Sequence, residues 1–384
     1  MFFYLIYFAL PILALGLNDV DELTKGNNQF TADIFGVLQN KQQGNFMFSP
    51  FSAQCIFGLT SEGAKQQTFT QLVDGIKIPS NKTVRRTAFH STITALQHNS
   101  TDLKLLTANQ IYVKLGFDLK PAFLDVAKNI YEANAESINF VENEAAAKTI
   151  NDWVKSRTNN KIENLVSPDS LSATTVAVLI NCLYFSGFWQ KPFDAIGKDV
   201  FHVSECQNKS VDFMTVESSF NYYEDSHAQY VELPYNSTDV DISMIVVLPK
   251  SGKTLKDLPL TTVFKKPKMT KTSVKIILPK WYVTNTFELV PILQTLGIED
   301  LFEPGVADLS NIAGQPGDLY VSESIQKTFI NVTESGTEAA AATSITISLT
   351  SVILTTKSFT ANRPFYYYIQ SKGLILFAGR VLNP

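Results

Sequence analysis

Residues 337–350 carry a strand-like pattern that constrains the fold more than any other part of the sequence. Apolar and hydroxyl side chains alternate from position 345 onward, with Ile345, Ile347 and Leu349 on one face. This period of two is typical of a β-strand with one buried face. The earlier residues of the same parity are small and uncharged: Thr337, Ala339, Ala341 and Thr343. One whole face of the segment can therefore enter a hydrophobic core.

The composition of this region favours addition to a β-sheet. The 18 residues from Ala339 to Thr356 contain no charge, no Pro and no Gly, so nothing prevents them from pairing with a strand edge. An Ala-rich helix is the main alternative, although the β-branched half is a poor helix former. A membrane span is disfavoured because eight of the 18 residues are Ser or Thr, and a linker would be richer in Gly, Pro or charge.

Residues 1–16 predict a secretory signal peptide. They are apolar and end in Ala14-Leu15-Gly16, a small-residue cleavage site, although they lack the usual basic start. No other run is long and apolar enough to span a bilayer. We therefore expect a secreted, extracellular protein with no membrane partner, in which residues 17–384 form one large domain.

Composition restricts the partners and the covalent chemistry of the chain. The 32 Lys and Arg residues nearly balance the 36 Asp and Glu residues, so net charge predicts no nucleic-acid partner. Cys55 and Cys182 lie in apolar stretches and are expected to be buried, whereas Cys206 is expected to be exposed. Glycosylation is expected at some of the sequons that begin at Asn81, Asn99, Asn208 and Asn236. A fifth sequon, at Asn331, lies within an expected strand.

Helical and strand-like stretches occur in comparable amounts and form no regular βαβ alternation, which favours an α+β fold with several sheets. One helix is expected to start at Ser49-Pro50, where Ser can cap the first turn and Pro can occupy it. Other helices are expected at about 18–39, 65–74, 83–98, 121–132, 143–158, 254–265 and 286–296. Strands are expected near 104–114, 173–186, 199–204, 211–223, 229–234, 240–248, 272–283, 319–332, 352–360, 364–370 and 374–382.

Motifs for catalysis are scarce. The four histidines form no His-Glu-x-x-His pair, and no Gly-x-Ser-x-Gly elbow occurs, so the sequence supports neither a zinc protease nor an α/β-hydrolase. We therefore expect no metal site, no prosthetic group and no enzymatic activity.

Ordered short motifs over nearly the whole of residues 17–384 resemble the signatures of the serpin family. They are Asn45 with Ser49-Pro50-Phe51-Ser52, Asn181 to Trp189 with Phe193, Glu232 to Tyr235, Ser243 to Pro249, Leu278 to Lys280, Leu296 to Ile298, Ala307 to Ser310, Gly336 to Ala342, Arg363 to Phe365 and Leu376 to Val381. The resemblance implies three β-sheets, about nine α-helices and an exposed reactive-centre loop within a single serpin domain. Residues 336–363 would form the hinge and this loop.

The same resemblance implies the function of a suicide-substrate inhibitor of serine proteases. In the family, cleavage of the loop leaves an acyl-enzyme, and the freed loop enters the large sheet as a new strand that carries the trapped protease with it. The partner would be a target serine protease, held in a covalent complex by a monomeric inhibitor. The hinge would consist of Gly336, Thr337, Glu338, Ala339, Ala340, Ala341 and Ala342. Residues 339–342 of the hinge are all Ala, and such small residues favour insertion.

Family loop length locates the reactive bond. Counting 14 residues forward from Gly336 or back from Pro364 reaches Thr350 in both cases, which selects the bond between Thr350 and Ser351. Thr is small and uncharged and would suit a shallow elastase-like pocket. If the register slips by one residue, Leu349 would suit a chymotrypsin-like enzyme.

Further positions acquire roles from the resemblance alone. Ser49, Ser52 and Asn181 match a polar cluster beneath the opening sheet, and Gln326 stands where many members have His. Lys280 and Glu334 match a pair at the top of that sheet, beside Trp189. Lys82, Arg85 and Arg86 lie at the start of a helix that binds heparin in some members, although a solvated helix face is the simpler reading.

A different function is compatible with the same fold. A non-inhibitory serpin would act in carriage, storage or chaperoning without trapping proteases. Its usual mark is a hinge with bulky, charged or Pro residues, and residues 339–342 are all Ala. This composition favours the inhibitor.

Overall fold

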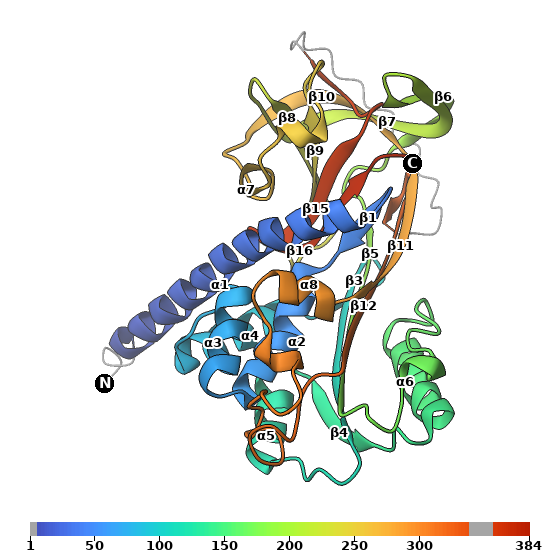
Figure 1. Cartoon of the computed structure of the whole chain (residues 1–384). Helices are drawn as coiled ribbons and strands as arrows, with labels where there is room; N and C mark the ends of the chain where they lie inside the picture. Colours follow the sequence, from blue (N-terminus) through green and yellow to red (C-terminus); the bar gives the residue numbers. More distant parts are fainter. Residues whose placement is uncertain (1–5, 338–355) are drawn as a thin grey trace.

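The computed structural model describes residues 6–337 and 356–384 (Figure 1). Helices and strands alternate irregularly, which confirms the α+β class. Within the described ranges the α-helices are α1 (Ile6–Lys41), α2 (Pro50–Gly63), α3 (Gln66–Gly75), α4 (Lys82–Leu96), α5 (Pro121–Ile130), α6 (Asn143–Arg157), α7 (Leu260–Val263) and α8 (Val290–Thr295). These eight are close to the expected nine.

A seven-stranded sheet carries the candidate site. Its strands lie in the order β11-β12-β13-β5-β3-β2, and β4 pairs with β3. They are β2 (His98–Asn99), β3 (Leu103–Lys114), β4 (Asn134–Ile138), β5 (Ala177–Phe188), β11 (Trp281–Glu288), β12 (Glu323–Val332) and β13 (Gly336–Thr337). β5 is antiparallel to β3 and parallel to β12.

Both faces of this sheet are covered, as Figure 1 shows with α6 on one side and α2 to α5 on the other. On β5, Leu179 and Leu183 join the main core, whereas Val178 and Ile180 join a second cluster beneath α6. A strand with two buried faces reads as a continuous apolar run rather than an alternating one. This explains why β5 is apolar over most of its length.

The other sheet has nine strands in the order β1-β16-β15-β9-β8-β7-β10-β14, with β6 paired to β7. They are β1 (Phe46–Phe48), β6 (Asp194–Ser204), β7 (Gln207–Glu224), β8 (Ala228–Pro234), β9 (Ile242–Pro249), β10 (Thr270–Pro279), β14 (Lys357–Thr360), β15 (Phe365–Ser371) and β16 (Leu374–Val381). The sequence predicted three sheets. Hydrogen bonds join two of them within the described residues because the 18-residue β7 pairs with β6 and β10 and also with β8.

Three predicted elements differ from the structure. The strand expected at 272–283 is broken after Pro279, where the chain leaves β10 and enters β11 of the other sheet. The helix expected at 254–265 is a 3-10 turn followed by the four-residue α7, with Pro259 between them. The helix expected at 286–296 shrinks to α8, because β11 extends to Glu288.

The capping prediction at Ser49 is correct. Its hydroxyl accepts a hydrogen bond from the Ser52 backbone amide, and Pro50 occupies the first position of α2. Such a cap satisfies an amide that a helix start would leave unpaired. Ser49 and Ser52 thereby begin a buried helix beneath the seven-stranded sheet.

The cysteine predictions are also confirmed, since Cys55 and Cys182 are buried and Cys206 is exposed. In the part of the chain that the structure describes, no helix meets the length and apolarity needed to cross a membrane. The residues predicted as a signal peptide run into α1 from Ile6, and their cleavage stays a prediction.

Candidate functional site

The described part of the hinge already lies in the seven-stranded sheet. Thr337 pairs with Val332 of β12 on one side and with Gly187 of β5 on the other. Its side chain is fully buried, and its hydroxyl lies 2.7 Å from the Tyr235 hydroxyl. Two residues of a new central strand are therefore in place at one end of the sheet.

Gly336 fits this position because the neighbouring backbone is very close. A Cβ atom at Gly336 would lie 2.1 Å from the Gly187 carbonyl oxygen. No side chain can be accommodated at that separation without a shift of the backbone. Glycine thus allows the hinge to enter between β12 and β5.

Farther along, β12 and β5 pair directly, and their register matches that at the hinge. The direct rungs run from Glu323–Val178 to Lys327–Cys182, an offset of 145 residues. Across Thr337, Val332 lies level with Gly187, which is the same offset of 145. Between these regions, the described residues 328–331 and 183–186 form no rung with each other. A strand can therefore extend from the hinge without sliding β12 along β5.

Several hydrogen bonds hold the turn that precedes the hinge. The indole nitrogen of Trp189 donates to the Thr333 carbonyl at 3.0 Å, and the Trp189 backbone amide donates to the Ser335 carbonyl at 2.9 Å. The Trp189 ring also stacks on Tyr235, with 4.5 Å between the ring centroids. Tyr235 therefore contacts both Trp189 and the buried hydroxyl of Thr337.

Lys280 and Glu334 meet at the same end of the sheet, as the resemblance implied. The Lys280 ammonium lies 3.0 Å from the Glu334 carboxylate, and both side chains are partly exposed. The Glu334 carbonyl also accepts a hydrogen bond from the Phe193 amide at 2.9 Å. An exposed ion pair contributes only about 0–1 kcal/mol. The backbone hydrogen bonds of Trp189 and Phe193 therefore contribute more than the ion pair to holding the turn before the hinge.

A buried polar cluster lies at the middle level of the sheet. The Gln326 amide group accepts from the Ser49 backbone amide at 2.8 Å and donates to the Ser49 carbonyl at 2.9 Å. It also donates to the Asn181 side-chain oxygen at 2.6 Å. Asn181 in turn donates to the Ser52 hydroxyl and to the Asn109 side-chain oxygen, at 2.5 and 2.6 Å. The cluster thus bridges β12, β5, β3 and α2.

Sequence reasoning did not identify Asn109 or give Tyr235 a role. Asn109 lies on β3 at a position of the same parity as Leu103 and Leu105, which are buried in the main core. A polar residue at an inward position of an apolar strand was the available signal. Tyr235 had no such signal, because its partners Trp189 and Thr337 are distant in the sequence.

We predict that Gln326→Leu lowers the free energy of unfolding by about 2–4 kcal/mol. The substitution leaves the Ser49 amide and carbonyl and the Asn181 oxygen without these partners, and each unsatisfied buried group costs about 1–3 kcal/mol before relaxation. Urea unfolding monitored by circular dichroism measures the change. Gln315→Leu, at an exposed position, is the control. Equal stability of the two variants would contradict the role given to the cluster.

The far end of the loop is anchored by β14, which pairs in parallel with β10. The Lys357 ammonium lies 2.9 Å from the Glu224 carboxylate, and Lys250 also binds this carboxylate. Gln229 donates to the Ser358 carbonyl at 3.0 Å. Hydrogen bonds from Lys250 and Lys357 lower the pKa of the Glu224 carboxyl to about 2.

We predict that Glu224→Gln speeds amide exchange in β14 roughly twofold to fivefold at pH 7, with Glu205→Gln as an exposed control. The pKa of Glu224 is about 2 in the folded protein and about 4.3 in the unfolded chain. The ionised carboxylate therefore stabilises the folded protein fully at pH values above about 4.3, and this stabilisation is lost as the pH falls through about 2. The difference between wild type and variant should therefore persist at pH 5 and disappear near pH 2. Hydrogen-exchange mass spectrometry, corrected for intrinsic exchange rates, measures this difference. Identical exchange of β14 in wild type and Glu224→Gln at pH 7 would show that the ion pairs of Glu224 do not hold this strand.

The remaining predicted loop residues lie outside the described ranges. They are Glu338, Ala339, Ala340, Ala341 and Ala342 of the hinge, and Leu349, Thr350 and Ser351 around the reactive bond.

The predicted cationic patch on α4 is not present as an exposed surface. Arg85 is 2% exposed, and its guanidinium binds the Glu62 carboxylate at 2.9 Å and the Ser80 carbonyl at 3.0 Å. Arg86 binds the other oxygen of the same carboxylate at 2.9 Å. Only Lys82 of the three is exposed, because Glu62 of α2 draws both arginines inward.

Three of the predicted glycosylation sites are exposed, namely Asn81, Asn208 and Asn236. The side-chain oxygen of Asn81 caps α4 by accepting from the Thr83 and Val84 amides. The side chain of Asn99 is not described. Asn331 lies within β12, as expected.

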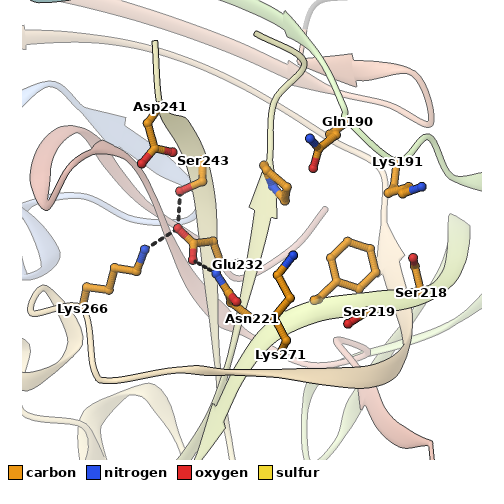
Figure 2. Close-up of a pocket in the computed structure, with 12 residues that line it drawn as sticks. Gln190, Lys191, Ser218, Ser219, Asn221, Glu232, Asp241, Ser243, Lys266 and Lys271 are labelled. Carbon is orange, nitrogen blue, oxygen red and sulfur yellow. Dashed lines mark hydrogen bonds and ion pairs between the residues drawn. The ribbon is translucent and has the colours of Figure 1, made fainter. Parts of the chain in front are cut away.

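A separate cavity of about 410 Å³ lies over β7, β8 and β9. Figure 2 shows Lys266, Ser243 and Asn221 directed at the carboxylate of Glu232, at 2.5, 2.7 and 2.8 Å. Burial alone would raise the pKa of Glu232, but these hydrogen bonds bring it below its usual value. Gln370 adds a fourth donor at 3.2 Å. The buried charge of this cavity is thus satisfied by the protein itself.

Comparison with known proteins decides the family. The family model described as "Serpin (serine protease inhibitor)" matches residues 25–384. The chain is a serpin. It is 34% identical to the antitrypsin of Bombyx mori, over 98% of this chain and 97% of the relative, and 33% identical to the alaserpin of Manduca sexta, over 98% of each.

Solved serpin structures agree with the fold. Serpin48 of the insect Tenebrio molitor matches with a TM-score of 0.88 and 35% identity, over 95% of this chain and 98% of that one. The thermophilic serpin Tengpin in its native state matches with a TM-score of 0.82 and 27% identity, over 94% of each chain. Members of this family are generally protease inhibitors rather than enzymes, and the insect relatives support inhibition of serine proteases by this serpin.

Proposed function

We propose that this serpin is an extracellular suicide-substrate inhibitor that traps a serine protease as an acyl-enzyme by inserting its cleaved loop into the seven-stranded sheet. The observation that carries the proposal is the pairing of Thr337 with both β12 and β5, at the same register offset as the closed rungs beyond it. Insertion then requires lateral separation of two strands and no axial slide.

If the register of Thr337 continues along β5 and β12, the apolar residues of the loop would face the hydrophobic core. Odd-numbered loop residues follow Thr337 to the buried face, because side chains alternate along a strand. Thr343 would lie level with Asn181 and Gln326, at the polar cluster, while Ile345 and Ile347 would lie level with apolar Leu179 and Ala177. The hydroxyl of Thr343 can replace the hydrogen bond between Gln326 and Asn181 that insertion separates.

Burial favours the inserted state. Covering Ile345, Ile347 and Leu349 would remove apolar surface from water, and the new strand would gain backbone hydrogen bonds, both of which oppose the entropy lost when the loop is ordered. The distance from Thr337 to Thr350 in an extended strand is about 43 Å. A protease attached at Thr350 would therefore be carried along the length of the sheet.

The scissile bond is proposed between Thr350 and Ser351, with Leu349 as the alternative reactive residue. A small uncharged Thr suits an elastase-like pocket, and Leu suits a chymotrypsin-like one. We further propose secretion after removal of residues 1–16, glycosylation at the exposed sequons, action as a monomer, and no cofactor.

We predict that Thr337→Arg converts the inhibitor into a substrate. Among the described residues, the fully buried Thr337 side chain has the Tyr235 hydroxyl as its hydrogen-bond partner. A guanidinium at this position would lose its hydration, so entry of the loop would fall behind hydrolysis of the acyl-enzyme. The stoichiometry of inhibition should rise at least tenfold. Thr261→Arg, at an exposed position of α7, should leave it unchanged. A stable protease complex formed by Thr337→Arg with wild-type stoichiometry would refute this role of the hinge.

The proposal is tested by incubating the protein with elastase-like, chymotrypsin-like and trypsin-like proteases. We expect a complex that survives denaturing electrophoresis with an elastase-like or chymotrypsin-like enzyme, and a released peptide that begins at Ser351. A peptide beginning at Thr350 would select Leu349 instead. Cleavage of the loop by every protease without any complex would favour the non-inhibitory alternative of carriage, storage or chaperoning.

A further inference from the structure

The end of the seven-stranded sheet opposite the hinge is closed by side chains as well as by backbone rungs. The Ser322 hydroxyl accepts a hydrogen bond from the Val176 amide at 3.0 Å, and the Tyr320 hydroxyl donates to the Thr174 carbonyl at 3.2 Å. The Ser322 amide donates to the Ala177 carbonyl at 2.9 Å. These contacts join the segments that lead into β5 and β12.

The register places these contacts in the path of the last loop residues. Because Thr337 pairs with Gly187 and Val332, each later residue lies one position farther back on both strands. Residue 347 would then lie between Ala177 and Ser322. Beyond residue 347 the strand register ends, because β5 starts at Ala177 and residues 173 and 174 form a turn. The hydrogen bond between Ser322 and Val176 therefore lies at the position that residues 347 and 348 would take, and the bond between Tyr320 and Thr174 lies directly beyond it.

These contacts would be broken later during insertion than the polar cluster, and their side chains are more exposed to solvent. Insertion from the hinge reaches Asn181 and Gln326 with residue 343, and reaches the far end only after four more residues. Tyr320 and Ser322 are partly exposed, so water can replace their hydrogen bonds when the strands separate. The barrier they add is therefore modest, and it acts when most of the loop is already in place.

We infer that Tyr320 and Ser322 form a latch with the Thr174 carbonyl and the Val176 amide, and that this latch controls the final step of loop insertion. Tyr320 and Ser322 are positioning residues: they hold β12 against β5 where the reactive residue must arrive. The inference rests on the proposed function, because it concerns how far the cleaved loop travels. It adds a third control point, distinct from the hinge and from the polar cluster.

The test uses the whole protein and two synthetic peptides that copy the loop. A peptide of residues 338–350 spans the latch, whereas a peptide of residues 338–345 ends above it. The double variant Tyr320→Phe, Ser322→Ala removes both hydroxyls. Tyr282→Phe, Ser156→Ala is the matched control, because it removes one tyrosine and one serine hydroxyl at exposed positions of β11 and α6. Incorporation is followed by native electrophoresis and mass spectrometry.

The latch variant should accept the long peptide about fourfold to 100-fold faster than wild type, since each of the two net hydrogen bonds changes a rate roughly twofold to tenfold. The short peptide and the control variant should show wild-type rates. Equal rates of the long peptide in variant and wild type would overturn the latch alone. Equal acceleration of both peptides would also overturn it, in favour of general loosening. Failure of wild type and variants alike to accept the long peptide would instead count against the proposed function.

Discussion

The shared register of β5 and β12 is the constraint on which the rest of the structure depends. The two strands are parallel, and their offset is the same where they touch and where Thr337 separates them. A new strand antiparallel to both can therefore enter with every backbone group matched. The antiparallel direction of β13 relative to β12 and β5 follows from the turn at residues 333–336, which Trp189 and Phe193 hold through backbone carbonyls.

Polar contacts as well as apolar ones hold the middle of the seven-stranded sheet together. Gln326 and Asn181 connect the two strands through a direct hydrogen bond at 2.6 Å, and they also bind Ser49, Ser52 and Asn109. Hydrogen bonds are directional, so this arrangement fixes one closed register, and an entering hydroxyl can take over the exchanged bond. Because Gln326 does not titrate, such an exchange would involve no pH-dependent group at the position where many family members have His.

Much of the fold could be predicted because its signals are local. The Ser49-Pro50 cap and the apolar run of β5 each reflect the environment of a single element. The break after Pro279 was missed because both β10 and β11 are strand-like, and only the sheet assignment separates them. The fusion of two expected sheets depends on the length of β7, which sequence pattern alone did not fix.

Within the candidate site, the predicted residues were those carried by motifs, and the missed ones act through distant partners. Asn109 and Tyr235 acquire their roles from Asn181 and Thr337, which lie on other strands. The burial of Arg85 follows from Glu62, a residue of another helix. The packing of distant segments determines these side-chain pairs, so the residue pattern within one segment cannot predict them.

The central claim, that the seven-stranded sheet accepts the cleaved loop as a strand, is tested most directly by hydrogen exchange of residues 338–347 after cleavage at the reactive bond. The account predicts that these amides become protected to the level of β5 and β12, because each finds a partner on one of the two neighbouring strands. Exchange of the same amides at the rate of an unstructured peptide, with the cleaved protein otherwise folded, would contradict it.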